Sequence, residues 1–186
     1  MTATTTSPRA WLMWALCVVA YASAVFQRTS FGVASASAAE RFASGASLTS
    51  LFVVVQLITY AAMQVPVGLL VDRLGTRVVV GAGAVLMCLG QVALAVSPDL
   101  ASAILARILV GAGDAMTFTA VLRLLPAWFA PRQIPMLNQL TSMLGQTGQL
   151  ASSLPFAALL GAAGWTQSFA AAAAVSAAMA ALVLAL

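Results

Sequence analysis

The strongest constraint on this chain is a succession of six apolar runs, each about as long as a membrane-spanning helix. A helix needs ~20 mainly apolar residues to cross the hydrocarbon core of a bilayer. Only 6% of the 186 residues are charged, whereas a soluble domain carries roughly 25%. We therefore predict an all-α membrane protein, with a polar tail at residues 1–10 and a six-helix transmembrane domain at 11–186. The predicted spans cover residues of about 11–34, 47–70, 76–97, 100–125, 134–160 and 165–186.

The first run also resembles a secretory signal peptide. Arg9 precedes the apolar stretch, and Ala22-Ser23-Ala24 resembles a cleavage site. The apolar run continues past that site, and five more runs follow. We therefore favour an uncleaved first helix.

The arginines in the short connections predict the orientation. Basic residues in such loops mark the cytoplasmic side of a membrane protein. With the N-terminus inside, most of them fall on that side, while Arg41, Glu40 and Asp99 fall on the other. We predict a multi-pass protein of the bacterial cytoplasmic membrane with both termini in the cytoplasm. The cytoplasmic arginines are then Arg9, Arg73, Arg77 and Arg132.

Composition argues against several other classes of protein. The chain has no His, the commonest metal ligand and general base. Its arginines are scattered, so they form no basic stripe for nucleic acid. Cys17 and Cys88 lie in different apolar runs and are expected to be small core residues. We expect no enzyme activity, no cofactor, no metal site and no nucleic-acid partner.

Polar side chains gather on four of the six runs. Such groups inside a membrane face the bundle interior or an aqueous cavity. We predict a cavity lined by the first, second, fourth and fifth helices and sheathed by the third and sixth, which we expect to face lipid. The alternative is that the Gln, Asn and Ser side chains only form hydrogen bonds between helices. The polar faces hold Trp14, Tyr21 and Arg28; Gln56, Tyr60 and Gln64; Arg107, Gly111 and Asp114; and Asn138, Ser142, Gly145, Gln149 and Ser152, with Gln139, Gln146 and Ser153 on an adjacent face.

Three charges lie in the interior of these runs, away from their ends, namely Arg28, Arg107 and Asp114. An Arg or Asp in the middle of a membrane helix costs at least ~2.5 kcal/mol on insertion scales. Arg107 and Asp114 are seven residues apart, ~10.5 Å along a helix, so each is expected to have a partner on another helix. Asp114 is the best candidate for a carboxylate that couples transport to protons.

The loop between the second and third runs carries a motif of a known family. Gly68-x-x-x-Asp72-Arg73-x-Gly75-x-Arg77 resembles, at every defining position, the loop motif of the major facilitator superfamily. The resemblance implies the N-terminal half of a twelve-helix transporter, built as a 3+3 inverted repeat. It also implies that this gating loop latches the two halves together during alternating access. The alternative is that the loop only anchors the topology.

Two further segments are similar to the same family. Arg107-x-x-x-Gly111-x-Gly113 resembles its fourth-helix motif, with Val110 where Gln is usual. The start of the sixth run, Gly164-Trp165…Phe169, is also typical. The fifth-helix Gly-Pro motif of drug/proton antiporters is absent, so drug export is not favoured.

The segment from Phe26 to Phe31 resembles organophosphate antiporters and related anion symporters within this family. There the Arg at the position of Arg28 binds the anionic group of the substrate. A guanidinium offers two parallel donors to a phosphate or carboxylate. The alternative is that Arg28 snorkels to the outer interface. The expected substrate-binding residues are Arg28, Tyr21, Gln56, Tyr60, Gln64 and Asn138, and the expected coupling residues are Asp114 and Arg107.

These observations predict a secondary transporter of a small anionic organic solute, with proton or ion coupling. The alternative is a truncated or half-size membrane protein that does not transport by itself. The sixth run reaches Leu186 with no basic residue after it. We therefore expect a missing C-terminal half or a homodimer partner, beside the lipid bilayer and the solute.

Overall fold

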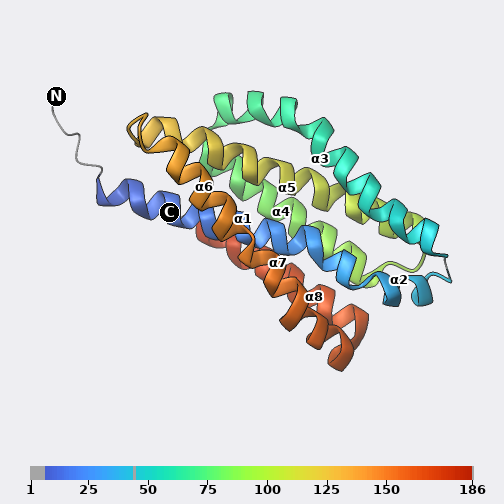
Figure 1. Ribbon diagram of the computed structural model, residues 1–186. Coiled ribbons are helices and arrows are strands. Elements are labelled where there is room, and N and C mark those ends of the chain that lie inside the picture. The colour runs from blue at the N-terminus through green and yellow to red at the C-terminus, as the bar shows by residue number, and fades with distance from the viewer. Residues whose placement is uncertain (1–6, 44, 186) are drawn as a thin grey trace.

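The computed structural model describes residues 7–43 and 45–185, except for the side chains of residues 46–49. All of its regular secondary structure is helical, which confirms the predicted all-α class (Figure 1). The elements are α1 (Pro8–Val33), α2 (Ser35–Arg41), α3 (Ala46–Leu74), α4 (Thr76–Val96), α5 (Leu100–Trp128), α6 (Ile134–Gly145), α7 (Thr147–Ala151), the π-helical turn η1 (Ser152–Phe156) and α8 (Ala157–Ala185).

Local sequence signals set where several of these helices begin. The Ser7 side chain accepts a hydrogen bond from Ala10 N, and Pro8 occupies the first turn of α1, where its missing N–H costs nothing. The Asp99 carboxylate accepts from Ser102 N at 2.8 Å at the start of α5, and this bond lowers the pKa of Asp99. Gly75 joins α3 to α4 at a φ of 81°, a conformation that favours glycine.

Within the described residues, five helical stretches are long and apolar enough to cross a membrane. The last of them, Ile134–Ala185, spans 52 residues, which is far more than one crossing needs. Its helical geometry is broken at Gly164, where φ is 77° and ψ is −176°. The chain reverses in this part of α8, so that its end lies back along the bundle (Figure 1). The sixth crossing and the inverted repeat remain predictions.

The core is densest where α4 packs against α5 and against the second part of α8. A Cβ on Gly83 of α4 would lie 2.7 Å from the carbonyl oxygen of Gly113 in α5, so these helices approach backbone to backbone. The prediction that the third and sixth runs only face lipid is wrong. Both helices contribute fully buried polar side chains, Gln91 from α4 and Ser176 from α8.

These two side chains meet Gln27 of α1 in a polar network between three helices. Gln91 Nε2 donates to Gln27 Oε1 at 2.8 Å, and Gln27 Nε2 donates to Ser176 Oγ at 2.5 Å and to Ala172 O at 2.7 Å. All three side chains have no exposed surface. This network was not predicted from the sequence, because most of α4 consists of glycine and apolar residues and the helix shows no polar face.

The helix α3 is the least covered of the long helices. It lies at one edge of the bundle and arches away from its neighbours (Figure 1). Ile58, Val65 and Leu69 on its outer face are 62%, 76% and 60% exposed. Its inner face, with Gln56 and Val67, packs against α5. The second run therefore presents one polar face inward and a broad apolar face outward.

Candidate functional site

Two charges predicted to be important meet near the centre of the bundle. Arg28 of α1 and Asp114 of α5 form an ion pair, with 3.4 Å between Nη1 and Oδ2. The Asp114 side chain is fully buried, while 24% of the Arg28 side chain is exposed. The Tyr60 ring of α3 lies against the guanidinium, with 5.6 Å from Arg28 Cζ to the ring centroid. Arg28 therefore has one face on the protein and one face open.

The second guanidinium, that of Arg107, is completely buried. Its Nη2 donates to Gln56 Oε1 and, at 3.1 Å, to the carbonyl oxygen of Arg28. Its Cζ lies 4.9 Å from the centroid of the Phe31 ring. Among the described residues, Arg107 Nε and Nη1 have no hydrogen-bond partner. Arg107 and Asp114 thus each have a partner on another helix, as their spacing predicts.

Gly111 explains how Gln56 comes so close to Arg107. A Cβ on Gly111 would lie 2.7 Å from the backbone oxygen of Gln56, so only glycine lets α3 and α5 approach at this level. The glycine of the fourth-helix motif therefore positions the side-chain oxygen that accepts from Arg107.

The charges in this part of the bundle do not balance. Arg28 and Arg107 are two cations, and Asp114 is the one carboxylate paired with either of them among the described residues. An unpaired charge in a low-dielectric interior is costly, so the site favours one more negative charge.

The open face of Arg28 lines a cleft of about 340 Å³ between α1, α3 and the α7–η1 segment. Two of its lining residues, Thr29 of α1 and Ser152 of η1, are hydrogen-bonded to each other, with 2.8 Å between Oγ1 and Oγ. Val33 and Val53 add apolar side chains to the lining. The lining residues are Arg28, Thr29, Gly32, Val33, Val53, Gln149, Ser152 and Ser153.

The remaining residues predicted to bind substrate lie outside this cleft. Tyr21 is buried against the Phe118 ring at 4.8 Å between centroids. Gln64 Oε1 accepts from Thr119 at 2.7 Å. Asn138 lies on α6, eleven residues before Gln149 and so ~16 Å away along the helix. Their binding roles remain predictions.

The predicted gating loop makes two contacts with residues far away in the chain. The Oδ1 atom of Asp72 accepts from the guanidinium of Arg123 on α5. Arg77 is exposed and donates to the carbonyl oxygen of Leu184 near the end of α8. Gly68 leaves room for Arg123, since a Cβ there would lie 3.2 Å from Nη2. Arg73 is exposed.

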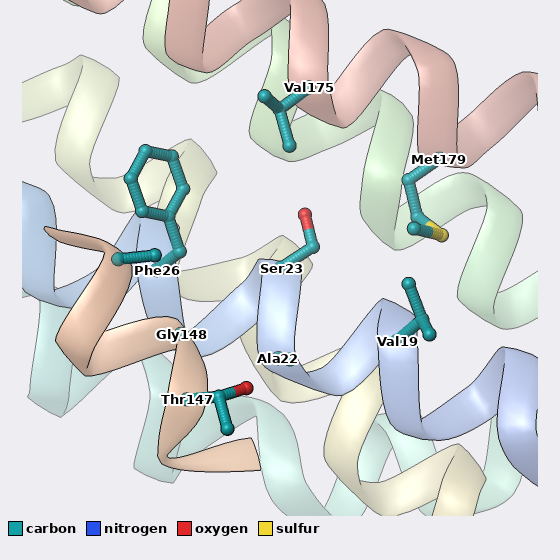
Figure 2. Close-up of a pocket in the computed structure, with 9 residues that line it drawn as sticks. Val19, Ala22, Ser23, Phe26, Thr147, Gly148, Val175 and Met179 are labelled. Atoms are coloured by element: carbon teal, nitrogen blue, oxygen red, sulfur yellow. The ribbon is translucent and has the colours of Figure 1, made fainter. Parts of the chain in front are cut away.

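A second cavity, of about 300 Å³, is apolar. It lies between α1, α7 and α8, and Figure 2 shows Phe26, Val175 and Met179 around it. Ser23 is the polar side chain that the view draws closest to its centre (Figure 2). With no charged residue in its lining, this groove suits hydrocarbon rather than a charged solute.

Sequence reasoning missed Thr29, which lines the cleft at Arg28. Gln149, Ser152 and Ser153 also line it; they were placed on the predicted polar faces but not among the expected substrate-binding residues. The signal was present, because the fifth run carries polar side chains on two adjacent faces. What the sequence could not show is which face meets α1. Among the described residues, no group of three or more His, Cys, Asp or Glu side chains could hold a metal ion.

The fold and this site define a multi-pass membrane protein with a charged, partly open centre, which is the architecture of a membrane transporter. The family model of the Major Facilitator Superfamily matches residues 17–186. The chain therefore belongs to the major facilitator superfamily, whose members are transporters, and it is a transporter of that type. No curated protein is similar enough to count as a match.

Proposed function

We propose that the chain moves a small organic anion across the bacterial cytoplasmic membrane by alternating access, with Arg28 as the group that binds the anion. The observation that carries this proposal is the excess of positive charge at the site. Among the described residues, Arg28 pairs with one carboxylate and Arg107 with none, in a region where uncompensated charge is costly. A carboxylate or phosphate on the solute supplies the missing negative charge.

Arg28 suits this role because its guanidinium is only partly covered. Its open face meets a cleft of about 340 Å³, which is large enough for a small solute. Arg107 has no exposed surface, so its part is to hold Gln56 and the backbone of Arg28 in place.

Asp114 is proposed to couple the solute to a proton. Its carboxylate partly neutralises the guanidinium that binds the solute, so an ionised Asp114 weakens the attraction of Arg28 for the anion. When a proton neutralises Asp114, the excess positive charge at the site rises, and the site binds the anion more tightly. This linkage favours binding of a proton and an anion together.

The gating role of the loop Gly68–Arg77 is also part of the proposal. Asp72 and Arg123 link the inner ends of α3 and α5, and both side chains are about half exposed, at 53% and 49%. A second polypeptide half, or a second copy of the chain, can therefore reach this pair. The exposed outer face of α3 offers an apolar surface to the same partner.

Uptake by the chain in liposomes tests the proposal. Labelled small carboxylates and phosphates are offered to wild type, Arg28→Lys and Arg28→Gln. We expect uptake by wild type, a reduced rate in Arg28→Lys because the parallel donors are lost, and none in Arg28→Gln. Equal uptake by all three would refute anion binding at Arg28.

A further inference from the structure

The apolar cavity at Ser23 is one end of a longer groove between α1, the α7–η1 segment and α8. A second hollow, of about 200 Å³, adjoins the first one of about 300 Å³. The two hollows share Phe26, Ala151 and Val175 as lining residues, so they form one continuous groove. The wider hollow extends to Met179 (Figure 2), and the narrower one extends to Leu159.

The groove is too narrow to hold another helix. On the α7–η1–α8 stretch its lining runs from Thr147 to Leu159, which is ~18 Å of helix. Spread over that length, the two volumes correspond to a groove only ~5–6 Å across, whereas a helix with its side chains is ~10–12 Å in diameter. A single hydrocarbon chain is the kind of molecule that fits this shape.

The lining favours a neutral occupant that comes from the bilayer. None of the described residues that line the two hollows is charged. Val19 of α1 and Val175 of α8 border the groove and are 51% and 44% exposed, so it opens at the surface of the bundle. Both residues lie in stretches that are long and apolar enough to cross a membrane. An occupant can therefore enter sideways from the hydrocarbon.

One polar atom interrupts this apolar lining. Ser23 Oγ points into the groove (Figure 2), and Ser23 is only 9% exposed. Among the described residues, this hydroxyl has no hydrogen-bond partner. A buried hydroxyl without a partner is costly, and a plain hydrocarbon chain would leave it so. The occupant therefore needs one hydrogen-bonding group at this point.

The position of Ser23 along α1 excludes the polar groups of an ordinary phospholipid. Ser23 lies 15 residues after Pro8, ~22 Å along a helix of ~39 Å, and so close to the middle of the membrane. The headgroup of a phospholipid stays at the surface of a hydrocarbon core that is ~30 Å thick. Its polar atoms therefore do not reach Ser23, whereas a small neutral group inside the membrane does.

A carbonyl group suits Ser23 better than a hydroxyl group does. A carbonyl oxygen only accepts, so the single O–H of Ser23 satisfies it, whereas an alcohol also brings a donor that needs a partner of its own. The wider hollow lies at Ser23 and the narrower one leads to Leu159. The shape therefore places the carbonyl in the wider hollow and an apolar tail in the narrower one.

We propose that this groove is a binding site for a neutral lipid with a carbonyl group and a single apolar tail, in which Ser23 Oγ donates a hydrogen bond to the carbonyl oxygen. The site is separate from Arg28 but shares a wall with its cleft. Gly148 and Ala151 line the groove, while Gln149 and Ser152 of the same helical segment line the cleft. A lipid in the groove therefore contacts the segment that borders the Arg28 cleft.

Photolabelling in vesicles tests this site. The probe is a long-chain methyl ketone with a diazirine in its tail, offered to the chain in vesicles of phosphatidylethanolamine and phosphatidylglycerol. Two comparison probes carry the same diazirine. One is the matching alkane, which lacks the carbonyl, and the other is a phosphatidylethanolamine with the diazirine in one acyl chain. Labelled positions are read by mass spectrometry of the digested chain.

We expect the ketone to label the groove at Ala151 and Val175, and unlabelled ketone to compete with it. Ser23→Ala should weaken binding of the ketone by about threefold to tenfold, which is the effect of one neutral hydrogen bond. Labelling by the alkane should not change in this variant. Because Ser23→Ala adds no bulk to the core, this comparison does not depend on a variant that may fail to fold.

A second variant blocks the groove. Ala151→Phe fills the place where the two hollows join and should abolish saturable labelling by the ketone. Leu154→Phe is the matched control, because Leu154 lies on the same segment, is 71% exposed and is not part of the lining. Both variants are first shown to elute as a single species in detergent.

Three results would overturn the proposal. Equal labelling of the groove by the phospholipid and the ketone would mean that ordinary bilayer lipid fills it. Unchanged binding of the ketone in Ser23→Ala would mean that the hydroxyl does not contact the carbonyl. Saturable labelling that persists in Ala151→Phe would place the ketone outside the groove.

Discussion

Arg28 of α1 and Asp114 of α5 form an ion pair across the bundle, with 3.4 Å between Nη1 and Oδ2. The two side chains differ in their exposure to solvent. Asp114 is sealed from solvent, while Arg28 opens to a cleft. A solute can therefore reach the cation without displacing the helix that carries the anion.

Replacement of Asp114 by Asn tests the coupling that this pair implies. We expect wild-type uptake of the anion to rise as the external pH falls, because a protonated Asp114 no longer neutralises part of the charge of Arg28. In Asp114→Asn the carboxylate is absent. The ratio of uptake at about pH 5.5 to uptake at about pH 7.5 should therefore fall to about one. Membrane insertion should not change. A pH dependence retained in full would rule out Asp114 as the coupling group.

Gly83→Ala should destabilise the contact between α4 and α5. The new Cβ would lie 2.7 Å from Gly113 O and 2.9 Å from Met116 Cβ, and neither neighbour can withdraw easily. Overpacking of this kind costs ~1–3 kcal/mol. The free energy of unfolding in detergent measures the effect. Gly161→Ala is the matched control, because a Cβ there meets nothing within 4 Å.

The buried amide network should show coupling between its members. Gln91→Leu removes the donor to Gln27 Oε1, and Gln27→Leu removes the acceptor together with two donated bonds. Each single variant should lose stability, and the double variant should lose less than the sum. We expect a coupling energy of about 0.6–2 kcal/mol, as for other hydrogen bonds within membranes. Strictly additive losses would show that the bond contributes nothing.

The pair formed by Asp72 and Arg123 should affect transport rate more than stability. Exposed ion pairs contribute only ~0–1 kcal/mol, so Asp72→Asn and Arg123→Gln should leave the free energy of unfolding nearly unchanged. If the pair controls the opening of the inner side, both variants should lower the rate of uptake. The charge exchange Asp72→Arg with Arg123→Asp should then recover part of it. A loss of stability with normal uptake would indicate a purely structural role.

The family motif was the most reliable guide to this protein, because its residues perform local tasks. Gly75 adopts the positive φ that a reversal needs, and Gly111 admits Gln56. Such requirements are fixed by the backbone nearby. The sequence could not show the hydrogen-bond partners of Asp72 and Arg77, because these partners lie 51 and 107 residues away.

The positions of the third and sixth runs could not be predicted from their polarity. A membrane helix with a single Gln in its interior is typically predicted to face lipid. Gln91 nevertheless lies at the centre of a contact between three helices, because Gly83 and Gly90 let α4 approach its neighbours closely. In a membrane protein, small residues indicate close packing between helices as much as polar residues do. The polar faces of the first, second and fourth runs did point to Arg28, Gln56, Arg107 and Asp114.

The π-helical turn Ser152–Phe156 changes which side chains of the fifth run share a face, because the residues after the turn are rotated about the helix axis relative to those before it. In a π-turn the hydrogen bonds span five residues instead of four. If the same residues continued as a regular α-helix, each residue beyond the turn would lie one helical position, about 100°, away from its present setting. Phe156, now packed against Phe26 and Phe169, would then leave that cluster while Gln149 kept its place in the lining of the Arg28 cleft. The extra residue in this one turn therefore keeps the Arg28 cleft and the aromatic packing in register.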